Sequence, residues 1–227
     1  MPMSMRVPHT LFGMAHHVPD ERQEFAATLR AVGPQAPTLC GDWRTSELLA
    51  HLILRERLSA EVAGRVPVRR LRELSEHVIA GYVAEHEYPE MVDTFEAGPP
   101  AISPWAIPAI REAFNLLEYT VHHEDVRRGA GDATPRTLPP LPREQAIWNR
   151  LRRSAPFTMR MVPIRVRLEW PGHGSVDAGR RGHGTVRVTG APMELALVAF
   201  GRQRVAQVTY HGSQADVATV SGARIAV

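Results

Sequence analysis

Residues 108–128 read PAIREAFNLLEYTVHHEDVRR, a long helical pattern that Gly129 closes. On a wheel of 100° per residue, four polar side chains of this stretch fall within an arc of about 80°. They are Asn115, Glu118, His122 and Asp125. An apolar stripe runs beside them, so the stretch predicts a helix that carries a polar stripe into the interior of a helical bundle.

A second helix is predicted over residues 45–63, and His51 lies in the middle of its apolar face. The i,i+4 pair Glu118 and His122 points to one spot, and a buried His51 could join them there. Two imidazoles and one carboxylate leave coordination positions open, which is typical of catalytic metal sites. The same residues also fit a buried ion pair or hydrogen-bond network without metal.

The periodicity changes from helical to alternating after Pro156, which predicts an α+β protein built from two units. We expect an N-terminal extension over residues 1–19, a metal-binding helical bundle over 20–154 and a small α+β domain over 155–227. The proline-rich stretch 135–142 is the alternative boundary between the two units. The bundle helices are predicted at 20–32, 45–63, 68–86, 89–98, 108–128 and 143–154. The second unit is predicted to hold strands at 162–170, 185–189 and 205–210, with a helix at 193–200.

The composition excludes several classes of protein. With 44% hydrophobic and 22% charged residues, the chain can bury a core and is not generally disordered. One cysteine, Cys40, excludes a disulfide scaffold and a Cys-rich zinc module. The 27 basic residues are all arginine and spread along the chain, with a net charge of +3, so no nucleic-acid partner is expected. Short apolar runs predict no membrane span and a cytoplasmic protein.

Three stretches together resemble the DinB-like metalloenzymes, whose actinobacterial branch includes mycothiol-dependent maleylpyruvate isomerase. They are GDW at 41–43 with ELLAHL at 47–52, NLLEYTVHHEDVRR at 115–128, and TGAPMEL at 189–195 with FGR at 200–202. The second stretch is most similar to an uncharacterised metal-binding subfamily with a VHHEDVRR signature. The third resembles a sterol-carrier-like α+β domain. The resemblance spans about residues 20–220.

The resemblance implies a DinB-like four-helix bundle whose metal ligands are His51, Glu118 and His122. It implies one divalent metal, zinc first and otherwise nickel or iron, together with mycothiol or another small thiol. The expected activity is that of an isomerase or S-transferase, in which a metal-activated thiolate adds to an electrophilic small molecule. Two alternatives stay open: a non-haem iron(II) enzyme that uses oxygen on the same ligands, and a non-catalytic metal-binding protein.

Two positions depart from the family pattern. Arg44 stands where the family has a Thr or Ser helix cap, so Thr45 is expected to take that role. The N-terminal extension with His16 and His17 has no counterpart in the family, and its role is left open. The sequence does not identify the substrate or the oligomeric state, and no residue is assigned as a general acid or base.

The residues around the predicted ligands receive provisional roles. Asp125 is expected to orient a ligand imidazole or to pair with Arg55 or Arg128. Asn115 is placed beside it, behind the ligands. Arg202 and Arg55 are candidates for substrate binding, with a structural role as the alternative for Arg202. The others are predicted to lie off the site: His123 in the core, Cys40 as a buried small apolar residue, and His173 and His183 in exposed turns.

Overall fold

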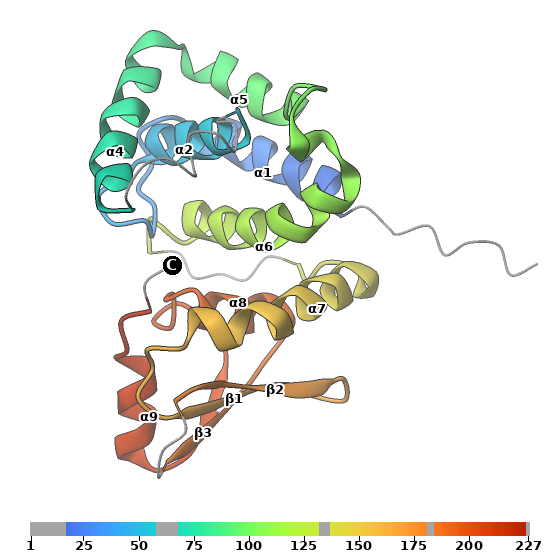
Figure 1. The fold of residues 1–227 in the computed structure, drawn as a ribbon, viewed down its shortest axis with the longest axis vertical. Coiled ribbons are helices and arrows are strands. Elements are labelled where there is room, and N and C mark those ends of the chain that lie inside the picture. The colour runs from blue at the N-terminus through green and yellow to red at the C-terminus, as the bar shows by residue number, and fades with distance from the viewer. Residues whose placement is uncertain (1–16, 58–67, 132–136, 181–183, 226–227) are drawn as a thin grey trace, which may run out of the picture.

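The computed structural model describes residues 17–57, 68–131, 137–180 and 184–225. It confirms the expected α+β class, with a helical unit stacked on a unit of helices and strands (Figure 1). None of the helices that the structure describes is both long and apolar enough to cross a membrane.

The N-terminal unit is helical. It comprises α1 (Val18–Val32), α2 (Thr45–Arg57), α4 (Val68–Glu85), α5 (Tyr88–Ala97), the short 3-10 helix η1 (Pro104–Ala106) and α6 (Pro108–Arg127). Helix α1 packs on α5 and α6, and α2 packs on α4 and α5. The buried faces follow the helical period, as in α1, where Phe25, Ala26 and Leu29 are fully buried. The predicted continuation of α2 beyond residue 57 lies outside the described residues.

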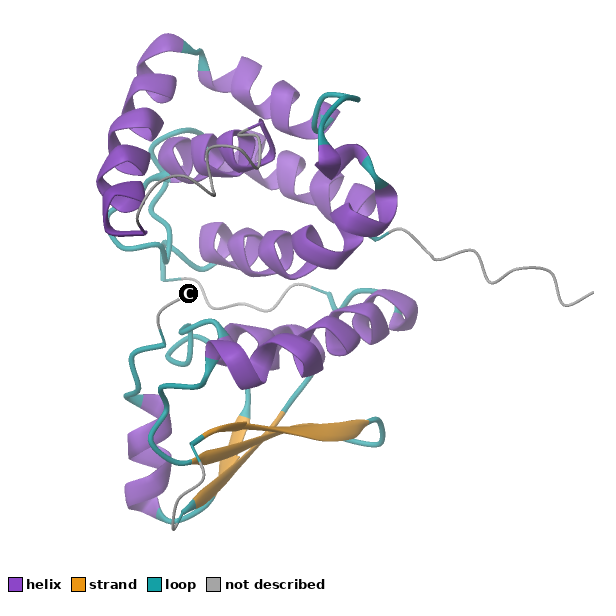
Figure 2. Ribbon diagram, in the orientation of Figure 1, coloured by secondary structure: helices purple, strands orange, loops and turns teal. Residues whose placement is uncertain are grey.

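The C-terminal unit is a four-stranded mixed sheet with helices on it. It comprises α7 (Leu141–Thr158), β1 (Arg165–Trp170), β2 (Gly174–Gly179), β3 (Thr185–Thr189), α8 (Pro192–Ala199), β4 (Thr209–His211) and α9 (Gln214–Ser221). The strand order is β2-β1-β3-β4, with β1 parallel to β3 and the other pairs antiparallel. Helices α7 and α8 lie between the sheet and the helical unit (Figure 2).

One predicted element of this unit was wrong in extent, and two observed elements were not predicted. The strand expected at 205–210 is reduced to Thr209–His211, because the amides of Val205 and Ala206 bond to the carbonyl of Arg202 in a turn. Strand β2 and helix α9 were not predicted, since each buries a single side chain, Ala178 and Val220, and shows no clear hydrophobic period.

Helix α7 is longer than predicted. It was expected to end at Ser154 but continues through Pro156 to Thr158. Burial of Ala155 and Met159 in the core offsets the hydrogen bond that the proline removes. The expected domain boundary between residues 154 and 155 therefore falls inside this helix, which packs on α8 and β2 as well as on α6.

A buried ion-pair cluster joins the two units. The Arg128 side chain, fully buried, donates from Nε to Glu124 at 2.6 Å and from Nη2 to Glu194 of α8 at 2.7 Å. Its Nη1 donates to the carbonyl of Val205 at 2.7 Å. Desolvating such charges is expensive unless they are paired, so this cluster holds α6 and α8 in one relative position.

Gly129 allows the loop before α2 to approach the end of α6. A Cβ atom at Gly129 would lie 2.1 Å from the carbonyl oxygen of Pro37 and 2.6 Å from the Cα of Thr38. Beside it, the amide of Leu39 donates to the carbonyl of Asp125 at 3.1 Å. The close contact therefore fixes the loop that carries Cys40 against the C-terminal turn of α6.

We expect Gly129→Ala to destabilise the protein by about 2 kcal/mol or more, because backbone must move to admit the methyl group. Gly81→Ala is the matched control: Gly81 is helical and a Cβ there meets nothing within 4 Å. That change should stabilise the protein by about 0.5–1 kcal/mol. Urea unfolding of both variants measures the difference, and equal stabilities would contradict the close contact.

Candidate metal centre

The three predicted ligands meet between α2 and α6. Oε1 of Glu118 lies 3.5 Å from Nε2 of His51 and 3.4 Å from Nε2 of His122. One ligand atom from each residue lies within 4.8 Å of the others. The i,i+4 spacing on α6 places Glu118 and His122 on one face, and fully buried Ala50 and Leu52 hold α2 so that His51 faces them.

These ligands line a cavity of about 930 Å³. Trp43 packs on His51 with ring centroids 5.3 Å apart, and the His51 and His122 rings meet edge to face at 5.8 Å. Each ring is therefore restrained by a neighbour. Arg55, Cys40 and Arg202 also line the cavity.

The second ring nitrogen of His122 is held by Asp125. Nδ1 lies 2.8 Å from Oδ2 of Asp125, a fully buried carboxylate. Arg202, from the segment after α8, donates to both Asp125 oxygens at 2.8 and 2.6 Å. Asp125 thus pairs with neither Arg55 nor Arg128, the partners considered from the sequence. Its contact with His122 is the one that orients a ligand imidazole in metal sites.

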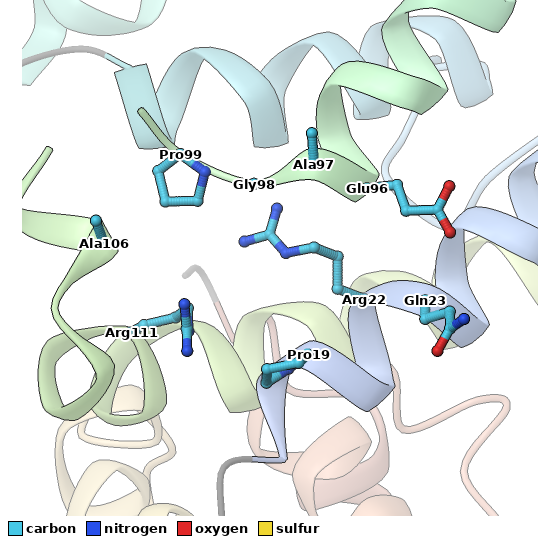
Figure 3. Close-up of a pocket in the computed structure, with 9 residues that line it drawn as sticks. All are labelled: Pro19, Arg22, Gln23, Glu96, Ala97, Gly98, Pro99, Ala106 and Arg111. Atoms are coloured by element: carbon cyan, nitrogen blue, oxygen red, sulfur yellow. The ribbon is translucent and has the colours of Figure 1, made fainter. Parts of the chain in front are cut away.

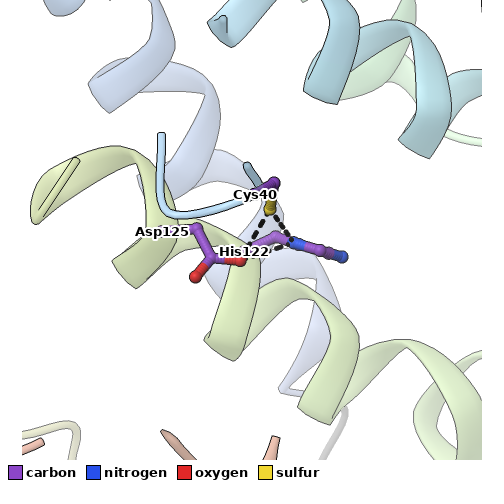
Figure 4. Close-up of side chains that lie close together, drawn as sticks. All are labelled: Cys40, His122 and Asp125. Atoms are coloured by element: carbon purple, nitrogen blue, oxygen red, sulfur yellow. Dashed lines mark hydrogen bonds and ion pairs between the residues drawn. The ribbon is translucent and has the colours of Figure 1, made fainter. Parts of the chain in front are cut away.

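Cys40 also contacts this carboxylate, so its prediction as a buried small apolar residue was wrong (Figure 4). Its thiol donates to Oδ2 of Asp125 at 3.1 Å, and Sγ lies 3.5 Å from Nδ1 of His122. The side chain is half-buried and faces the cavity. Cys40 and Asp125 are 85 residues apart in the sequence. Their contact depends on the close approach of the loop to Gly129, which no local sequence pattern predicts.

The structure therefore presents two overlapping groups that could hold a cation: His51, Glu118 and His122, or Cys40, His122 and Asp125. In the second group, the Arg202 guanidinium already occupies both carboxylate oxygens, and its positive charge opposes a cation there. In the first, Glu118 faces two imidazoles, and its cationic neighbour Arg55 is more distant, with Nε at 3.5 Å. The donor set of the first group fits a divalent cation.

The site is strongly polarised. Burial would raise the pKa of Glu118, but hydrogen bonds from His122 and His51 and the charges of His122 and Arg55 hold it well below its usual value. Burial would lower the pKa of His122, yet its bonds to Asp125, Cys40 and Glu118 raise it well above 6.5. These contacts favour the protonated form of His122 in the metal-free protein, and a cation that binds at Nε2 must compete with a proton there.

A buried network that the sequence did not reveal lies behind the ligands. Arg55 donates to Oδ1 of Asn115 at 2.6 Å and stacks over Trp105 at 5.0 Å. Asn115 in turn donates to Oε1 of Glu56 at 2.7 Å. Glu56 also accepts from Arg22 and from the Tyr119 hydroxyl. Asn115 thus reaches the ligands through Arg55, whose guanidinium lies beside Glu118.

Three further histidines for which the sequence suggested a role lie within the described residues. His123 faces α1, where Nδ1 lies 2.9 Å from Glu21 and its ring stacks on Phe25 at 4.9 Å. His173 is in an exposed turn and stacks on Trp170 at 3.7 Å. His17 directly precedes α1 and makes no side-chain capping bond. His16 and His183 lie outside the described residues.

The expected cap at Thr45 was wrong. Its hydroxyl donates to the carbonyl of Gly33 and so ties α2 to the end of α1. At the start of α2, the backbone amide of Arg44 instead donates to Oε2 of Glu47 at 2.9 Å. This is the carboxylate half of a capping box.

Comparisons of the chain with known protein families, with curated proteins and with solved structures gave no match. The site is therefore assessed on its own geometry.

Asp125 should make the metal-free protein sensitive to acid. Burial would raise its pKa, but the bonds to His122 and Arg202 lower it from 3.8 to about 2. A depressed pKa stabilises the fold above the unfolded value, and that stability is lost as pH falls through about 2. The shift corresponds to about 2 kcal/mol. In urea unfolding at pH 5 to 2, Asp125→Asn should flatten the pH dependence.

Asp177→Asn is the matched control, because Asp177 pairs with Arg167 on the surface with its side chain 44% exposed. That change should leave the acid profile close to that of the unmodified protein. If Asp125→Asn keeps the same slope as the unmodified protein, the carboxylate does not carry the charge assigned to it.

Proposed function

We propose that this chain is a metal-dependent enzyme that uses a small thiol, mycothiol or a relative of it. The thiolate adds to an electrophilic small molecule, and the enzyme acts either as an isomerase or as an S-transferase. The observation that carries the proposal is the convergence of His51, Glu118 and His122 on one cavity. Three ligands of this kind leave room in the coordination sphere for outside ligands. Zinc suits the donor set first, with nickel and iron as the other candidates.

The resemblance to DinB-like metalloenzymes supports the same ligands. On this proposal the helical unit is a DinB-like four-helix bundle, and the unit from β1 to α9 is a sterol-carrier-like domain that closes one side of the site. Arg202 links the two units, because it belongs to the C-terminal unit and its guanidinium donates hydrogen bonds to Asp125 of α6.

A divalent ion held by these residues would bind a thiol as its thiolate, well below the free thiol pKa of about 8.5. Asp125 holds the ring of His122 in place, and Arg202 holds Asp125. Arg55 and Arg202 line the cavity and are the candidates to contact a polar substrate. A cavity of about 930 Å³ is at the upper end of small-molecule pockets and has room for a thiol and a small electrophile.

A second candidate uses the same donor set. Two histidines and one carboxylate also hold iron(II) in enzymes that activate oxygen. The two candidates differ in metal preference and in whether a thiol or oxygen is consumed. A metal closed to outside ligands would favour a third candidate, a non-catalytic metal-binding protein.

We expect one divalent ion per chain. His51→Ala, Glu118→Ala and His122→Ala should each lower zinc affinity at least tenfold, because each removes one of three protein ligands. Elemental analysis after dialysis and competition with a chromophoric chelator measure the loss. Exposed His211→Ala is the matched control and should keep one zinc per chain.

His123→Gln tests the register of α6, because the next residue along the helix faces Glu21 rather than the cavity. That variant should keep its zinc while losing stability. The ligand assignment fails if His123→Gln empties the site and His122→Ala does not.

A thiol should bind at the open position. With cobalt in place of zinc, an added thiol should produce a thiolate-to-cobalt charge-transfer band near neutral pH, with the thiol pKa lowered by one unit or more. Asp125→Asn should still bind one metal ion, because it removes no ligand. It should weaken the thiol response or the metal affinity roughly 10–100-fold, because the ring of His122 loses the carboxylate that orients it. Mycothiol should be more effective than simple thiols if the C-terminal unit contacts its sugar portion.

Cys40→Ser separates the protein's own thiol from the added one, because Cys40 already lies in the cavity. The band should persist in that variant. Oxygen uptake by the iron form, with no thiolate band for any thiol, would instead support the oxygen-using enzyme.

A further inference from the structure

A second cavity, of about 360 Å³, lies at the other end of the polar stripe of α6 (Figure 3). It is lined by residues of α1, of the end of α5 and the segment after it, of η1 and of α6, and two of them are Arg22 and Arg111. Arg111 precedes Glu118 by seven residues, so it lies about 10 Å from it along the helix. This cavity is separate from the candidate metal centre.

The half-buried Arg111 side chain contains a donor atom without a partner. Its Nε atom is buried and makes no hydrogen bond, and among the described residues it has no ion pair. The neighbouring carboxylate, Glu112, is used elsewhere, since its Oε1 accepts from the amide of Val18 at 2.8 Å. The Arg111 side chain lines the cavity without an ion pair of its own, so its guanidinium is available to an acidic group bound there.

The other charges around this cavity do not compensate Arg111. Arg22 is paired with Glu56, to which its Nη1 donates at 2.9 Å. The acid among the described lining residues, Glu96, bonds Arg30 at 2.5 Å and points away from the cavity in Figure 3. Pro19, in the first turn of α1, also lines it. Among the described lining residues, Arg111 is therefore the charged side chain without an ion pair.

We infer that this cavity binds a small oxyanion, with a carboxylate, sulfate or phosphate group that pairs with the guanidinium of Arg111 and faces Arg22. A planar guanidinium with an unused N–H suits such a group. The cavity has room for a few heavy atoms beyond the anionic group itself. This inference does not depend on the proposed metal or thiol chemistry.

Inorganic sulfate is the probe, because its oxygens offer the acceptors the site lacks and it is a weak metal ligand. Calorimetry of the full chain, with chloride at matched ionic strength as reference, should show saturable binding of one sulfate. The Nε–Hε signal of Arg111 should shift in NMR titration. Arg111→Gln should weaken sulfate binding at least tenfold. Arg204→Gln, an exposed residue with the same change in charge, should stay within twofold.

Ala106→Glu tests the same site without removing the arginine, because Ala106 lines the cavity and a carboxylate there can reach it. That variant should lose sulfate binding and raise the melting temperature. His51→Ala should keep sulfate binding. The inference is overturned if sulfate shows no saturable binding, if the Arg111 signal does not move, or if His51→Ala abolishes binding while Arg111→Gln retains it.

Discussion

The buried carboxylate of Asp125 is the group on which the site depends. Its charge has no access to water, so it must be compensated by neighbouring groups. His122 provides one contact from the same helix, Cys40 provides another from the loop before α2, and Arg202 provides two from beyond α8. One carboxylate thereby fixes the imidazole that faces the cavity, the loop at its rim and the C-terminal unit beside it.

The sequence was sufficient for the parts of the site that lie close together on one helix. The i,i+4 pair Glu118 and His122, and the placement of His51 on an apolar helix face, follow from the helical period. The contacts that support these ligands could not be predicted from the helical period. Arg202 is 77 residues from Asp125 in the sequence, and Cys40 is 85 residues from it. Strand β2, which buries one side chain, was missed for a related reason: pairing with β1, rather than an alternating pattern, holds it in place.

A chain of buried polar side chains crosses the hydrophobic interior of the helical unit and connects the two cavities. Arg22 lines the second cavity and bonds Glu56, Glu56 accepts from Asn115, and Asn115 accepts from Arg55 at the candidate metal centre. Such a network is stable when its members satisfy one another, because an unpaired member costs its full desolvation. Substitution of Glu56 should therefore displace Arg22 at one cavity and Asn115 and Arg55 near the other, although Glu56 itself lines neither cavity.

The central claim is that His51, Glu118 and His122, rather than Cys40, His122 and Asp125, hold the metal. X-ray absorption at the zinc edge of the protein loaded with one equivalent of zinc tests it most directly, without added thiol. The account predicts nitrogen and oxygen scatterers near 2.0–2.1 Å, including two imidazoles, and no sulfur. A sulfur scatterer near 2.3 Å that disappears in Cys40→Ser would contradict it and would place the ion at Cys40, His122 and Asp125.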